Sequence, residues 1–212
     1  KFLFDFIVNN KEIKSVLEIG CGHGISSLTI SSALENRIGT THTIIDPFQE
    51  EIFYNLGIQL LEEQNLSNFI FIDMKSSDAL PTIDDEFDLI FIDGWHTFDQ
   101  VMVDIFYSIN LLKSGGYIII DDADFPSVGK AISYFIKLPN IKFEKELSTK
   151  FKSASYKRKI GLIIRKVLNE RLAQIFLPKY LFDKYFYQLS STMIILKKLG
   201  QDNRPWDYHK IF

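Results

Sequence analysis

Short apolar segments alternate with longer amphipathic segments over the first two thirds of the chain. The short segments are rich in β-branched residues, and several are apolar on both faces, as expected for parallel strands covered by helices on both sides. Strands are predicted at 15–19, 41–45, 68–72, 87–92, 117–120 and 141–147, with a last strand at 191–197. Helices are predicted at 25–35, 48–64, 98–112 and 128–137. This order predicts a doubly wound α/β sheet.

The region before the last predicted strand has a different pattern. Between 155 and 189, apolar positions recur at helical spacing among lysines and arginines, which predicts a basic amphipathic helix. Residues 1–149 contain 10 basic and 23 acidic residues, whereas residues 150–212 contain 14 basic and 4 acidic. The sequence therefore predicts a core at 1–150, a helical insertion at 151–190, and a last strand with a tail at 191–212. The insertion has three open interpretations: a lid or homodimer contact, a helix on a membrane surface, or a site for acidic substrates.

Composition excludes several classes of protein. With 46% hydrophobic and 14% aromatic residues among 212, the chain is a folded domain. Its single cysteine excludes an internal disulfide, its four histidines lack zinc-finger spacing, and its apolar runs are too short to span a bilayer. The acidic body contains no recognisable nucleic-acid module, so we expect no nucleic-acid partner. We expect a cytoplasmic location.

A glycine-rich turn follows the first predicted strand. Gly20, Gly22 and Gly24 lie between that strand and a helix, where glycines permit a tight turn and let the backbone approach a nucleotide-like ligand. Glu18 precedes the turn. Asp46 ends the second strand about 20 residues further on, where a carboxylate can accept both hydroxyls of a ribose. The alternative is a tight connection that binds no ligand.

These strings resemble the motifs of the class I S-adenosylmethionine-dependent methyltransferases. The matching strings are Val-Leu-Glu-Ile-Gly-Cys-Gly-His-Gly at 16–24, Ser-Ser-Asp-Ala-Leu at 76–80 and Leu-Leu-Lys-Ser-Gly-Gly-Tyr at 111–117. The resemblance implies a seven-stranded sheet with an antiparallel last strand, and S-adenosylmethionine as cofactor. It also implies a set of cofactor-binding residues, namely Glu18, Gly20, Gly22, Gly24, Asp46, Ser77, Asp78 and Asp93.

A narrower resemblance concerns the acceptor side. Phe-Ile-Asp-Gly-Trp-His-Thr-Phe at 91–98 and the pair Asp121-Asp122 are similar to strings of the metal-dependent O-methyltransferases of the catechol and macrolide-sugar types. This resemblance implies a hydroxyl acceptor on a small molecule or sugar. His96 occupies the position of a lysine in the catechol type and of a histidine in the sugar type.

Physical chemistry independently favours a metal site here. Asp93, Asp121 and Asp122 follow two neighbouring strands, so their charges repel unless a cation such as Mg²⁺ is shared. His96 suits a general base, with Asp93 as the second catalytic residue. As alternatives, Asp121 or Asp122 caps the next helix together with Asp124, and His96 is a solvated loop residue.

The sequence as a whole predicts an S-adenosylmethionine-dependent enzyme that methylates a hydroxyl with the help of Mg²⁺. Cys21 is interpreted as a small packed residue, since no basic partner lies near it in sequence. Two other classes stay open. One is a non-catalytic cofactor-binding or assembly module that acts through the basic helix, and the other is a nicotinamide enzyme on a similar fold.

Overall fold

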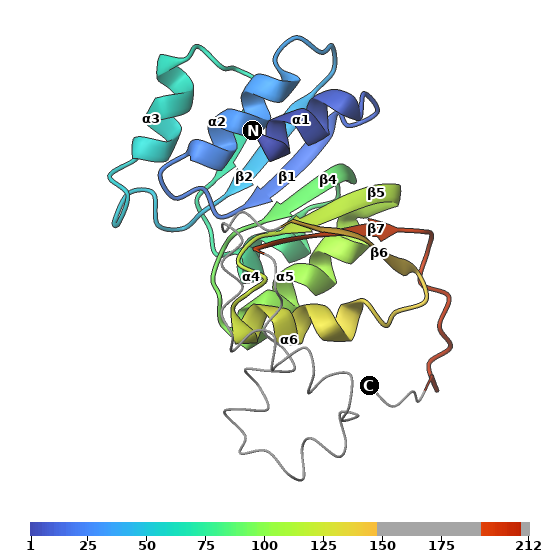
Figure 1. Ribbon diagram of the computed structural model, residues 1–212. Coiled ribbons are helices and arrows are strands. Elements are labelled where there is room, and N and C mark those ends of the chain that lie inside the picture. The colour runs from blue at the N-terminus through green and yellow to red at the C-terminus, as the bar shows by residue number, and fades with distance from the viewer. Residues whose placement is uncertain (148–191, 209–212) are drawn as a thin grey trace, which may run out of the picture.

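The computed structural model describes residues 1–147 and 192–208, which form a seven-stranded sheet in the order β3-β2-β1-β4-β5-β7-β6 (Figure 1). The strands are β1 Ser15–Ile19, β2 Thr41–Ile45, β3 Phe69–Ile72, β4 Phe87–Ile92, β5 Leu112–Ile120, β6 Ile141–Leu147 and β7 Met193–Lys198. β1 to β5 pair in parallel, whereas β7 lies antiparallel between β5 and β6. This confirms the predicted sheet with its antiparallel last strand.

Helices cover both faces of the sheet. They are α1 Phe2–Asn9, α2 Ile25–Leu34, α3 Leu56–Glu63, α4 Ser76–Ala79, α5 Phe98–Leu111 and α6 Pro126–Phe135, with a 3₁₀ turn at Leu80–Thr82. α1, α2 and α3 lie on one side, and α4, α5 and α6 on the other (Figure 1). Separate apolar clusters fill the two interfaces, as expected for a sheet buried on both faces. Within the described ranges, no helix is long and apolar enough to cross a membrane.

The ends of four parallel strands lie level at one edge of the sheet. Ile19 of β1 pairs with Ile45 of β2 and with Ile92 of β4, which in turn pairs with Ile120 of β5. The next residue after each of these isoleucines is a predicted site residue: Gly20, Asp46, Asp93 and Asp121. Register alone therefore brings the glycine turn and the acids to one edge, where open α/β sheets bind ligands.

The prediction of a helix at 48–64 is wrong over its first half. Residues 48–55 form turns, and α3 begins only at Leu56. Tyr54 and Asn55 have positive φ angles of 51° and 60°, which no continuous right-handed helix accommodates. The carboxylate of Asp46 also accepts a hydrogen bond from the backbone N–H of Phe48, at 2.7 Å, and so begins a turn. β5 begins at Leu112 rather than at 117. The predicted insertion at 151–190 lies outside the described residues.

Two helices of the described residues, α1 and the short α4, were not predicted. α1 precedes β1, and the Arg37 guanidinium donates hydrogen bonds to the backbone oxygens of Ile7 and Val8 at its end, at 2.7 and 3.1 Å. The same side chain reaches Asn10 and Ile13 at 3.3 and 2.9 Å. Of these carbonyls, those of Ile7 and Asn10 also accept backbone N–H groups, so Arg37 adds to the bonding of a helix end and of the loop after it. Arg37 therefore fixes the segment that leads into β1.

Candidate functional site

The glycine turn after β1 is shaped by contacts of the chain with itself. Gly20, Gly22 and Gly24 have φ angles of 93°, 52° and 81°. A Cβ on Gly20 would lie 2.1 Å from the backbone oxygen of Asp93, and one on Gly24 would lie 2.6 Å from that of Gly57. A Cβ on Gly22 would meet only the ring of Phe53, at 3.8 Å. Gly20 and Gly24 are thus required by packing, whereas a Cβ on Gly22 would make only an ordinary van der Waals contact.

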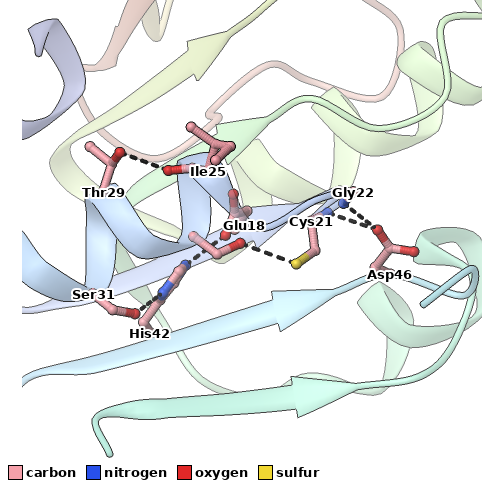
Figure 2. A network of polar contacts seen from close by, with 9 residues as sticks. Glu18, Cys21, Gly22, Ile25, Thr29, Ser31, His42 and Asp46 are labelled. Carbon is pink, nitrogen blue, oxygen red and sulfur yellow. Dashed lines mark hydrogen bonds and ion pairs between the residues drawn. The ribbon is translucent and has the colours of Figure 1, made fainter. Parts of the chain in front are cut away.

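Asp46 holds this turn in place. Its Oδ2 accepts hydrogen bonds from the backbone N–H groups of Cys21 and Gly22, at 2.8 and 2.9 Å (Figure 2). Its Oδ1 accepts the bond from Phe48 described above, and the residue is only 3% exposed. A carboxylate with three backbone donors around it is a positioning group for the turn, and its predicted contact with a ribose stays a prediction.

Gln49 is a second support that the sequence analysis missed. Its Nε2 donates to the backbone oxygen of Gly22 at 2.8 Å and lies 3.3 Å from Asp46 Oδ2. The residue is 1% exposed. No periodic or motif signal marks a glutamine at this position, because its role depends on the irregular turn at 48–55.

Glu18 lies in the interior beneath the glycine turn. Glu18, His42 and Ser31 are all fully buried. His42 Nε2 approaches Glu18 Oε2 at 3.1 Å, and His42 Nδ1 lies 2.8 Å from Ser31 Oγ (Figure 2). His42 and Ser31 were not identified from the sequence; a histidine within an apolar strand was the only available signal. Burial raises the pKa of the neighbouring Cys21 thiol to about 12, which agrees with its interpretation as a packed, unreactive residue.

The predicted nucleobase-side residues lie after β3. Ser77 and Asp78 belong to the short helix α4, where Ser77 Oγ lies 3.4 Å from Asp78 Oδ1 on the exposed side. Behind them, Gln100 Nε2 donates to Ser76 Oγ at 2.9 Å and to Asp104 Oδ1 at 3.0 Å. Asp104 is fully buried, so α4 is fixed from the inside while Ser77 and Asp78 face outward.

The acids after β4 and β5 come together with His96. One ligand atom each from Asp93, His96 and Asp122 lies within 4.8 Å of the other two. His96 Nε2 is 3.1 Å from Asp122 Oδ2 and 3.7 Å from Asp93 Oδ1. Asp121 is not a member of this group, and its Oδ1 accepts the N–H of Asp122 at 2.8 Å. Of the predicted metal ligands, Asp93 and Asp122 therefore group with His96, and Asp121 stays a predicted ligand beside them.

Electrostatics couple these four groups. Burial, together with the charges of Asp93 and Asp122, raises the pKa of Asp121 to about 6. Burial also raises the pKa of Asp93. The contact with Asp93 and the charges of the neighbouring carboxylates raise the pKa of His96. The cluster holds more negative charge than it can neutralise, and it favours a proton or a cation.

Asp121, Asp122 and His96 also had alternative interpretations as helix caps and as a solvated loop residue. No side chain caps α6, whose N-cap residue is Phe125, so capping by Asp121 or Asp122 is not observed. His96 is held by Asp122 and by a ring contact with Phe125, 5.2 Å between centroids, so it is not a loosely solvated loop residue.

Trp95, 56% exposed, contacts the ring of Phe48, with 5.5 Å between the ring centroids. Aromatic side chains thus flank the acids.

Comparisons with known proteins agree with this geometry. A family model described as "Methyltransferase domain" matches residues 17–123. A curated relative, a probable cobalt-precorrin-6B C(15)-methyltransferase (decarboxylating) of Saccharolobus solfataricus, is 30% identical over 63% of this chain and 65% of its own. The match thus spans less than two thirds of that relative's length.

Solved structures share the fold. The O-methyltransferase TomG from Streptomyces achromogenes, in complex with SAM, has a TM-score of 0.59 and 18% identity, over 69% of this chain and 72% of its own. An rRNA methylase from Streptococcus thermophilus has a TM-score of 0.60 and 12% identity, over 94% and 95%. The matched region contains the glycine turn, Asp46, the β4 acids and the β5 acids. The chain therefore belongs to the methyltransferase-domain family and has its class I fold.

Proposed function

We propose that the protein binds S-adenosylmethionine and transfers its methyl group to a hydroxyl oxygen of a small-molecule or sugar acceptor. The observation that carries this proposal is the direct contact between the two halves of the site. Gly20 of the glycine turn packs so closely on the backbone of Asp93 that a Cβ would not fit. A cofactor held by the turn would therefore lie next to the acids and His96. Family membership and the SAM complex of TomG support the choice of cofactor.

The residues present fit this cofactor. The glycine turn offers an open approach at Gly22 for its amino-acid part, and the buried carboxylate of Glu18 lies beneath the turn. Ser77 and Asp78 of α4 and Asp93 at the tip of β4 supply further polar groups. When bound, the cofactor supplies a methyl group on a positively charged sulfur. The chain's own task is to align an acceptor with that methyl, and positioning can contribute roughly 7–11 kcal/mol to such a step.

A divalent cation also fits the acid cluster. Asp93 and Asp122 offer hard oxygen ligands within 4.8 Å of each other, and Asp121 lies next to them, as suits Mg²⁺. A bound cation would acidify and orient an acceptor hydroxyl. It would also relieve the repulsion that helps raise the pKa of Asp121.

His96 is the proposed general base. Its imidazole is oriented by two carboxylates, and the same contacts raise its pKa, which increases its affinity for a proton. His96 would accept the proton of the acceptor hydroxyl on its imidazole. A general base of this kind contributes about 10²–10⁴-fold in rate.

Methylation of carbon is a second candidate. It rests on the curated relative whose printed name is that of a C(15)-methyltransferase. A carbon acceptor needs no metal-bound oxygen, so the two candidates differ in their dependence on a divalent cation.

The test is a methyl-transfer assay with S-adenosylmethionine and a panel of vicinal diols, phenols, sugars and a corrinoid. We expect transfer to a hydroxyl acceptor that is lost in excess chelator and restored by Mg²⁺. Full activity in excess chelator would remove the cation from the account, and transfer only to carbon would favour the second candidate. If S-adenosylhomocysteine does not form with any acceptor, the non-catalytic binding module is favoured instead.

A further inference from the structure

Three fully buried polar side chains from three elements form a chain beneath the glycine turn. They are Glu18 of β1, His42 of β2 and Ser31 of α2, each 0% exposed (Figure 2). The two contacts are 3.1 Å from Glu18 Oε2 to His42 Nε2, and 2.8 Å from His42 Nδ1 to Ser31 Oγ. The two imidazole contacts are compatible when Ser31 donates its O–H to Nδ1 and Nε2 presents a proton to Glu18. His42 and Ser31 are used nowhere in the proposed mechanism.

The Glu18 carboxylate keeps spare accepting capacity. Neither of its oxygens has a hydrogen-bond partner within the part of the chain that the structure describes, and His42 Nε2 makes a close polar contact with Oε2 at 3.1 Å. A buried carboxylate without bonded donors is costly, and such groups occur mainly where a ligand, ion or water completes them. A cation close to Glu18 would complete this one.

The charge of Glu18 reaches both halves of the site. Besides burial, it contributes to the raised pKa of Cys21 in the glycine turn and to that of Asp93 at the tip of β4. Glu18 thus favours positive charge between the tips of β1 and β4. The ammonium of the cofactor's amino-acid part is the positive group that the proposed function would bring there.

We propose that His42 and Ser31 are positioning residues that hold the Glu18 carboxylate and, through it, set the affinity for the cofactor's amino-acid part. The proposal rests on the proposed function. His42 fixes Glu18 from β2, and Ser31 fixes the plane of the imidazole from α2. Neither residue touches the cofactor, so their removal should weaken only those interactions that involve its amino-acid part.

Two ligands separate this role from a merely structural one. S-adenosylhomocysteine carries the amino-acid part, whereas methylthioadenosine keeps the nucleoside and lacks it. We would measure the affinity of both by calorimetry for the full chain and for His42→Leu, His42→Gln and Ser31→Ala. Ser32→Ala, the next residue on α2 and only partly buried, is the matched control.

For His42→Leu we expect about a tenfold or larger loss of S-adenosylhomocysteine affinity, with methylthioadenosine affinity unchanged within about twofold. His42→Gln retains a donor and should recover part of the loss. Ser31→Ala is a milder change, which serves if His42→Leu does not fold. It should also lower the affinity for S-adenosylhomocysteine, by a smaller factor. Equal losses for both ligands, or no loss for either in Ser31→Ala, would overturn the proposal. Absence of binding by the unaltered chain would instead overturn the proposed function.

Discussion

The two halves of the site are built in opposite ways. Around the glycine turn, Asp46 and Gln49 are almost fully buried, and their polar atoms bond to the backbone of the turn itself. Around the acids, Asp93, Asp122 and His96 are about one third exposed, and their contacts are with one another. The first half is preorganised by bonds to its own backbone, whereas the second carries an excess of like charge.

This difference indicates a division of labour. A preorganised turn costs little reorganisation when a nucleoside binds, which favours affinity. A cluster of like charges is costly in isolation, and it becomes favourable when a cation or a reacting proton enters. We therefore expect substitutions in the turn to act mainly on stability and cofactor affinity, and substitutions among the acids to act mainly on turnover and pH dependence.

The largest effect is expected for Gly20→Ala. Its Cβ would lie 2.1 Å from the backbone oxygen of Asp93 at a φ angle of 93°, so the two halves would have to separate. We expect a loss of at least about 3 kcal/mol in the free energy of unfolding, and loss of S-adenosylhomocysteine binding. Gly39→Ala is the control, because its φ angle of 71° is similar but no atom lies within 4 Å of its Cβ. It should cost only about 1–2 kcal/mol. If chemical denaturation gave the same loss in the free energy of unfolding for Gly20→Ala and Gly39→Ala, the close packing of the two halves would be contradicted.

The next effect is expected for His96→Ala. Removing the base should lower kcat by about 10²–10⁴-fold while leaving S-adenosylhomocysteine affinity within about twofold. Because its carboxylate contacts raise the pKa of His96, the unaltered enzyme should gain activity as pH rises through that raised pKa. The variant should lose this rise. Turnover equal to that of the unaltered enzyme would remove His96 from the mechanism.

A smaller effect is expected for Asp46→Asn. The amide cannot accept at both positions, so N–H groups of Cys21, Gly22 or Phe48 lose an acceptor. We expect a loss of about 1–3 kcal/mol in the free energy of unfolding and about a tenfold loss of S-adenosylhomocysteine affinity. Asp73→Asn is the matched control, since Asp73 follows β3 as Asp46 follows β2 but is exposed. If the two variants behaved alike, the positioning role of Asp46 would be wrong.

The smallest effect is expected for Asp121→Asn and concerns pH. In the folded chain the pKa of Asp121 is about 6, against about 4 in an unfolded chain. The folded state therefore binds more protons between these values, and the free energy of unfolding falls as pH rises from about 4 to about 6. Asp121→Asn should remove this fall. The substitution should raise the free energy of unfolding by on the order of 1 kcal/mol at pH 7.5 and leave it unchanged near pH 4. Denaturation curves at both values check this, and parallel pH profiles would contradict it.

The sequence predicted most of the sheet because its signals were local. Residues 15–19, 41–45 and 87–92 are short apolar runs between turn signals, and the structure confirms them as β1, β2 and β4. The glycine turn and the acids could be placed at one edge because parallel strands end together. What failed was the segment 48–55, where helical spacing of apolar residues competes with positive φ angles at Tyr54 and Asn55.

The site was predicted less completely than the fold, since side-chain partners are not encoded by spacing. Asp46 has the right position for a ribose ligand, yet its carboxylate turns back to the N–H groups of Cys21 and Gly22. Likewise, Asp122 groups with Asp93 and His96. Its backbone has a φ angle of 48°, and its N–H donates to Asp121 Oδ1. Such outcomes depend on backbone geometry that no residue pattern specifies.

The most direct measurement is a calorimetric titration of the full chain with S-adenosylhomocysteine, with NAD titrated in parallel. The account predicts saturable binding of S-adenosylhomocysteine at one site per chain, with an affinity in roughly the micromolar range, and no binding of NAD. No heat with S-adenosylhomocysteine, or saturable binding of NAD in its place, would contradict the claim that the glycine turn and the acids form one methyl-transfer site.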